Sequence, residues 1–141
     1  MTLPIIPHQR HQKQADHNYQ LLKENIFPDP CGNKNVDYKD WNITILFYTA
    51  LHYVQAYLSK NSSSLGYRTE FGSHHDRNNY LARISMTDHL LAKVVEDYIT
   101  LCNASFLARY NPCRYYYIQQ KEVCQFAIFA LQSLPNTLGL I

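Results

Sequence analysis

The sequence lacks long hydrophobic runs, closely spaced cysteines and a large net charge. No stretch approaches the ~20 apolar residues that a membrane-spanning helix needs, and Pro4 and Pro7 interrupt the short apolar stretch near the start of the chain. We therefore expect neither a membrane partner nor a signal peptide. The four cysteines form no Cys-x-x-Cys pair and lie at positions 31, 102, 113 and 124. This spacing favours reduced thiols in a cytoplasmic protein over a disulfide framework.

The net charge is only +2, with 13 basic and 11 acidic residues. This value is compatible with a nucleic-acid partner, but strong nonspecific binding to a polyanion needs clustered positive charge. A length of 141 residues suits one compact domain, and the apolar share of 46% argues against a disordered chain. Twelve tyrosines are many for this length, and tyrosine suits interfaces and stacking surfaces. Together with the apolar residues 138–141, they lead us to expect a homodimer.

Helical periodicity recurs along the chain, whereas no segment has the period of a strand. We expect an all-α fold, an antiparallel bundle of four to five helices. The expected helices span residues 8–26, 38–60, 74–84, 87–111 and 116–134. The second is apolar around most of its girth, which is typical of the centre of a bundle. A single domain is expected over residues 1–141, with residues 1–7 and 136–141 as tails.

Capping residues, proline and a polar loop predict several helix boundaries. Residues 61–66 are expected to form a surface loop, because serine, asparagine and glycine dominate them. Ser73 is expected to cap the third helix, and Ser85 or Thr87 to open the fourth. Pro135 is expected to end the last helix.

Three segments resemble pieces of a known helical family. Residues 40–52 (DWNITILFYTALH) are rich in aromatic residues, residues 72–77 read GSHHDR, and residues 105–110 read SFLARY. They resemble the start of the second helix, the start of the third helix and the run before the last helix of HEPN (higher eukaryotes and prokaryotes nucleotide-binding) domains. The resemblance spans most of residues 15–134 and implies a small helical domain that commonly pairs as a dimer.

The resemblance also implies a class of chemistry. Many HEPN domains are metal-independent ribonucleases whose arginine is followed, after four to six residues, by a histidine near the start of the last core helix. RNA supplies its own nucleophile, the 2′-hydroxyl. The histidine can move the proton of that hydroxyl, and the guanidinium can neutralise charge on the transition state.

The chain departs from this motif at its histidine. Arg109 occupies the place of the arginine, with the polar Asn111 nearby, but Arg114 stands where the histidine is expected. Arginine stays protonated and is a poor general base at neutral pH. Arg83 and His89 have a suitable spacing, but they lie between the third and fourth expected helices, which is the wrong place for the motif.

The candidate residues for binding a nucleic acid or a nucleotide are therefore cationic or imidazole side chains near the expected helix junctions. They are Arg77, Arg109, Asn111, Arg114, His52, His74 and His75. The catalytic residues are unknown. We expect no cofactor and no metal, because adjacent histidines on a helix diverge and rarely share an ion.

Structural roles compete with these binding roles. Arg109 and Arg114 can bond the last carbonyls of a helix, or pair with Asp88, Glu96 or Asp97. His52 lies in the most buried expected helix, where a core histidine with satisfied hydrogen bonds is the ordinary outcome.

Three functions follow from these alternatives. The favoured one is a HEPN-like domain that binds RNA or a nucleotide, of the kind found in toxin–antitoxin or defence systems, and that lacks the standard catalytic histidine. The second is an active metal-independent endoribonuclease, in which His52, His74, His75 or His89 replaces the missing base. The third is a non-enzymatic dimeric interaction module with a cognate protein partner.

Overall fold

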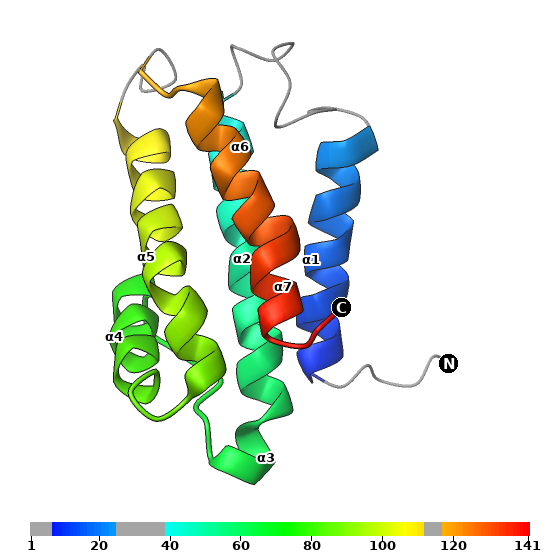
Figure 1. Cartoon of the computed structure of the whole chain (residues 1–141), viewed down its shortest axis with the longest axis vertical. Coiled ribbons are helices and arrows are strands. Elements are labelled where there is room, and N and C mark those ends of the chain that lie inside the picture. Colours follow the sequence, from blue (N-terminus) through cyan, green and yellow to red (C-terminus); the bar gives the residue numbers. More distant parts are fainter. Residues whose placement is uncertain (1–6, 25–38, 112–116) are drawn as a thin grey trace.

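Four long helical segments run side by side and alternate in direction, as Figure 1 shows. The computed structural model describes residues 7–24, 39–111 and 117–141. Within these ranges the chain is all-α and contains no strand, which confirms the expected helical bundle. The long segments are α1 (Pro7–Glu24), α2 (Lys39–Lys60), α5 (His89–Tyr110) and the consecutive elements α6 (Gln120–Ile128), η3 (Phe129–Ser133) and α7 (Leu134–Thr137). The shorter α4 (His74–Ile84) packs beside α5.

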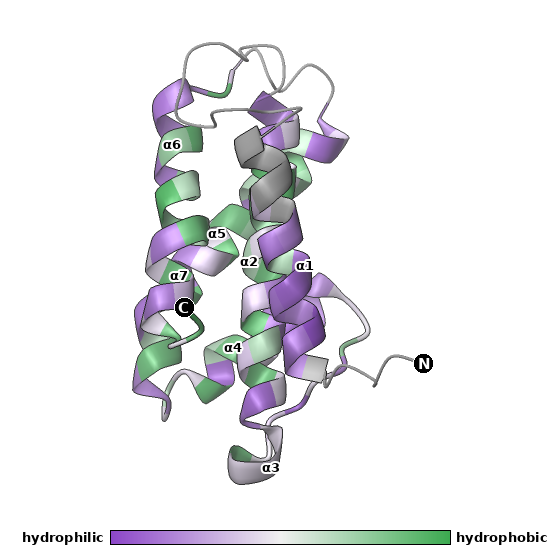
Figure 2. Cartoon of the chain, turned by 90° about the vertical axis from the view of Figure 1, so that its right-hand side faces the viewer, coloured by the Kyte–Doolittle hydropathy of each residue, from purple (hydrophilic) through white to green (hydrophobic). Residues whose placement is uncertain are grey.

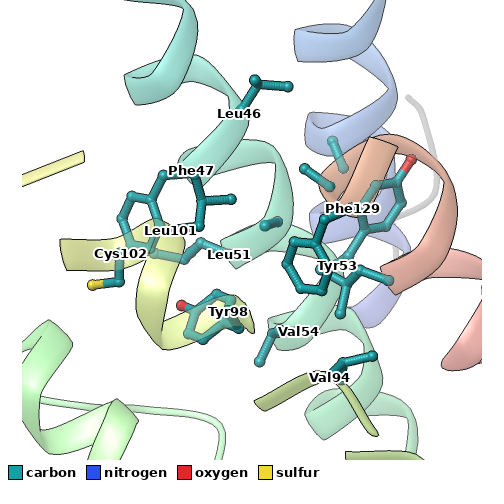
Figure 3. Close-up of a cluster of buried hydrophobic side chains, with 14 of the residues drawn as sticks. Leu46, Phe47, Leu51, Tyr53, Val54, Val94, Tyr98, Leu101, Cys102 and Phe129 are labelled. Atoms are coloured by element: carbon teal, nitrogen blue, oxygen red, sulfur yellow. The ribbon is translucent and has the colours of Figure 1, made fainter. Parts of the chain in front are cut away.

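The central position of α2 is confirmed. This helix packs against α1, α5, α6, η3 and α7, and 14 of its 22 residues are buried. In contrast, α1 is largely hydrophilic on its outer surface (Figure 2), and among its described side chains Ala15 is fully buried. In the core, Tyr98 and Leu101 of α5 lie against Phe47 and Leu51 of α2 (Figure 3).

The capping of α4 agrees with the prediction, and the capping of α5 corrects it. The Ser73 side chain accepts a hydrogen bond from the Asp76 amide and so caps α4. For α5 the cap is Asp88, neither Ser85 nor Thr87, because the Asp88 carboxylate accepts from two amides of the first turn. The hydroxyls of Ser85 and Thr87 instead bond carbonyls in the last turn of α4.

The end of the chain corrects two predictions. Pro135 does not end the last helix but lies in the first turn of α7, where the missing N–H of proline is tolerated. Residues 136–141 are not a tail, because Leu138 and Leu140 are 3% and 8% exposed. The Gln12 side chain of α1 also donates to the Leu140 carbonyl. These residues therefore belong to the bundle.

A short helix replaces part of the loop expected at residues 61–66. Residues Ser62–Leu65 form α3, and Gly66, with a φ of 69°, provides the left-handed residue that ends it. The helix is exposed, so its position at the surface agrees with the prediction.

Candidate anion-binding site

Arg77 is a buried cation in the first turns of α4. Only 9% of the residue is exposed, and its guanidinium lies 5.2 Å from the centroid of the Phe71 ring. The carboxylate nearest in sequence, Asp76, is engaged elsewhere, because it pairs with Arg68 at 3.1 Å and accepts from the Gly72 amide. No carboxylate in the described part of the chain forms an ion pair with Arg77.

Arg77 instead contacts an imidazole. Its Nη1 lies 3.0 Å from Nδ1 of His74. A guanidinium can only donate, so Nδ1 of His74 accepts, and the proton of the neutral ring is on Nε2. Burial lowers the pKa of His74, and the charges of Arg77 and Arg109 lower it further. His74 is therefore a neutral ring between two arginines, with an N–H to donate.

A second pair of imidazoles lies near Arg77. Nδ1 of His11, on α1, is 2.8 Å from Nδ1 of His52, on α2, so one ring donates to the other. Burial lowers the pKa of His52 to about 4, with contributions from His11 and the charge of Arg77. Burial and Arg77 also lower the pKa of His11. Both rings are thus neutral at pH 7, so they add no charge next to Arg77 and do not neutralise it.

Arg109 supplies a second guanidinium from the last turn of α5. Its Nη1 donates to the Tyr48 hydroxyl at 2.9 Å, and its Nε donates to the Ser105 carbonyl at 3.3 Å. Ser105 lies five residues before the end of α5, so its carbonyl is not one of the last carbonyls that Arg109 was expected to bond. The alternative pairing with Asp88, Glu96 or Asp97 is wrong, because no ion pair joins Arg109 to them in the described residues.

Arg109 and His74 line the same surface cavity. The cavity has a volume of about 340 Å³, and its wall also includes Ser73, His75 and Asn78. In and near this wall, buried polar atoms make no hydrogen bond within the described residues, including Oδ1 of Asn78 and Nε of Arg77. Burial raises the pKa of Tyr98, and the neighbouring Arg77 opposes that rise, so Tyr98 stays a neutral hydroxyl.

The predicted residues have four different outcomes. Arg77, Arg109, His52 and His74 lie close enough for the charge of an arginine to lower the pKa of both histidines. His75 lines the cavity but is exposed, and its Nε2 lies 3.1 Å from Nδ2 of Asn79. Asn111 caps the C-terminus of α5, where it is exposed. Arg114 lies outside the described residues.

The Arg83 and His89 pair, whose place in the sequence did not fit the motif, is absent from the residues that line the cavity. The Arg83 and His89 side chains are exposed, and Arg83 packs over the Tyr80 ring, 5.4 Å from its centroid. The three residues that sequence reasoning missed are His11, Tyr48 and Tyr98. His11 gave no local signal, because it lies in a polar helix whose neighbours in space are set by helix packing.

Chemically, the cluster suits a small anion. His74 lies near both guanidiniums, neither of which forms an ion pair with a carboxylate in the described residues, and guanidinium forms strong hydrogen bonds with carboxylate or phosphate oxygens. In the part of the chain that the structure describes, no three metal-binding side chains gather. No family model, curated protein or solved structure matches the chain. Among residues 7–24, 39–111 and 117–141, no helix combines the length and apolar character needed to cross a bilayer.

Proposed function

We propose that this chain is a HEPN-like domain that binds RNA or a nucleotide through a phosphate in the cavity at Arg109 and His74. The observation that carries the proposal is the buried Arg77 without a carboxylate, surrounded by neutral imidazoles and close to a second arginine. A buried charge without an ion-pair partner is costly, and an anion bound in the neighbouring cavity would offset part of that cost.

The cavity wall carries donors of the kind that bind a phosphate. Arg109 lies in the cavity wall, and within the described residues its Nη2 has no hydrogen-bond partner. The Nε2–H of His74 is a further donor, held in that tautomer by Arg77. Arg77 lies behind His74 and adds positive potential without having to touch the ligand.

Replacement of Arg109 tests the proposal. Arg109→Ala is expected to weaken binding of a labelled single-stranded RNA at least about 10-fold, because a hydrogen bond to a charged group contributes roughly 1.5–3 kcal/mol. Fluorescence anisotropy measures the affinity, and a thermal melt measures stability, which is expected to fall little because Arg109 is only half-buried.

Arg83→Ala is the matched control, since Arg83 is an exposed arginine outside the cavity. Equal losses of affinity in the two variants would mean that only net charge matters. A large fall in melting temperature with unchanged affinity would make Arg109 structural. If the unaltered chain binds neither RNA nor nucleotides, the interaction module becomes the better explanation.

The second candidate, a metal-independent ribonuclease, is favoured by histidines that lie close to two arginines. The tautomer of His74 opposes it, because Nε2 carries a proton and Nδ1 is occupied by Arg77, so the neutral ring has no free base site. Turnover of a labelled single-stranded RNA, abolished by Arg109→Ala and by His52→Ala, would favour the enzyme. The proposal also includes four further features. These are a homodimer, a cognate protein partner, a defence role and a cytoplasmic location.

A further inference from the structure

Arg109 lies in the wall of a second cavity as well. This cavity has a volume of about 270 Å³ and lies between the start of α2 and the end of α5. It is lined by Asp40, Trp41, Thr44, Ala108, Arg109 and Tyr110. Because the same arginine borders both cavities, they adjoin at its side chain.

Two exposed aromatic rings distinguish this second cavity. Trp41 is 56% exposed although most of α2 is buried, and Tyr110 is 66% exposed. In the described part of the chain, the Trp41 ring stacks on no other ring. The Arg109 guanidinium lies 5.3 Å from the Tyr110 ring centroid, so a cationic plane adjoins the aromatic surface. Aromatic rings and arginine planes are the surfaces on which unpaired nucleobases stack.

Asp40 adds a hydrogen-bond acceptor to this surface. One of its oxygens accepts from the Trp41 amide at 2.9 Å, and its carboxylate borders the cavity. An ionised carboxylate only accepts, so it selects a base edge that carries N–H groups. Guanine offers two such donors side by side, at N1 and at the exocyclic N2, whereas uracil offers one.

We propose that this cavity binds the nucleobase of the ligand, by stacking on Trp41 and Tyr110, and that Asp40 selects guanine. This inference rests on the proposed function, since the phosphate of the same ligand is placed at Arg109 and His74. It adds the class of base and the residues that read it.

Trp41 makes the test direct, because it is the single tryptophan of the chain. Guanosine 5′-monophosphate is expected to quench Trp41 fluorescence, whereas ribose 5-phosphate is expected to bind without quenching. Calorimetry is expected to show guanosine 5′-monophosphate binding roughly 5- to 150-fold more tightly than ribose 5-phosphate, the range that stacking of one base provides.

Three variants separate the contributions. Tyr110→Ala is expected to remove most of the difference between the two ligands, and Tyr117→Ala, which changes a similarly exposed tyrosine outside the cavity, is expected to preserve it. Asp40→Asn is expected to weaken the binding of guanosine 5′-monophosphate more than the binding of uridine 5′-monophosphate. An equal effect on both nucleotides would overturn the selecting role of Asp40.

The outcomes also separate this inference from the proposed function. Equal affinities for ribose 5-phosphate and guanosine 5′-monophosphate, with unchanged fluorescence, would overturn the base cavity and leave the phosphate site standing. Quenching by guanosine, without measurable binding of ribose 5-phosphate or inorganic phosphate, would support the base cavity and overturn the phosphate site. No binding and no quenching by any of these ligands would overturn both.

Discussion

Arg77 carries a full positive charge inside the bundle, and its neighbours adapt to that charge by staying neutral. His52 and His74 would each be partly protonated near pH 6.5 in water, but burial and the nearby arginine lower the pKa of both. The hydroxyl of Tyr98 also stays neutral, since burial raises its pKa and so opposes loss of its proton. At the residue scale, the cluster is therefore a charged centre within a neutral shell.

This arrangement predicts that the protein becomes less stable as the pH decreases. The unfolded chain protonates His52 with a pKa near 6.5, whereas the folded chain does so near 4. Between these values the unfolded state binds more protons, so the free energy of unfolding decreases as the pH falls from 7.5 to 5. His52→Gln is expected to reduce this dependence in urea titrations, and His89→Gln, at an exposed position, is expected to keep it. An unchanged slope in His52→Gln would show that His52 does not cause the dependence.

At the scale of the element, Asp88 links three parts of the fold. One oxygen of its carboxylate accepts from the amides of Leu90 and Leu91 and so caps α5. The other accepts from the hydroxyls of Tyr57, on α2, and Tyr67, in the connection between α3 and α4. Burial alone would raise the pKa of Asp88, but these hydrogen bonds lower it below its usual value. The cap of one helix is thus also a tether to the central helix.

Removing this carboxylate is expected to cost more than removing an ordinary cap. Asp88→Ala should lower the free energy of unfolding by about 3 kcal/mol, which combines a cap with buried hydrogen bonds to a charged group. Ser73→Ala removes the cap of α4 alone and should cost about 1 kcal/mol. Urea unfolding measures both values. Equal losses would mean that the tyrosine contacts contribute nothing to stability.

At the scale of the whole molecule, the end of the chain closes the bundle. Leu138 and Leu140 pack into the core, and the Leu140 carbonyl accepts from Gln12 of α1, so the last residues bind the first helix. In Figure 1 the C-terminus lies beside α1. These leucines were part of the reason to expect a homodimer, and their burial within the same chain removes that part. The homodimer stays a prediction that depends on the tyrosines and on the family resemblance.

Substitution at this end tests the closure. Leu138→Ala is expected to lower the free energy of unfolding by about 2–5 kcal/mol, the usual cost of truncating a buried leucine. Ile141→Ala, at a residue that is 64% exposed, should change it by less than about 0.5 kcal/mol. Both are read from urea unfolding curves. A small effect of Leu138→Ala would mean that the end of the chain is loosely held in solution.

The amino-acid sequence by itself determined the helices and the centre of the fold, because helical period and capping depend on neighbours along the chain. Apolar residues on most sides of the helix expected at residues 38–60 predicted that α2 lies at the centre of the bundle. Ser73 caps α4, as expected. Two predicted helix boundaries were wrong. Asp88 became a cap while it also bonded Tyr57 on α2, and Pro135 stayed within a helical segment.

The site depended on tertiary structure to a greater degree. The sequence indicated Arg77, Arg109, His52 and His74 as candidates, since cations and imidazoles are recognisable one by one. It could not show that His11 contacts His52, that Arg77 is buried without a carboxylate, or that Arg109 borders two cavities. Each of these depends on which helix faces which, and burial and electrostatic interaction arise only once α1, α2, α4 and α5 have packed together.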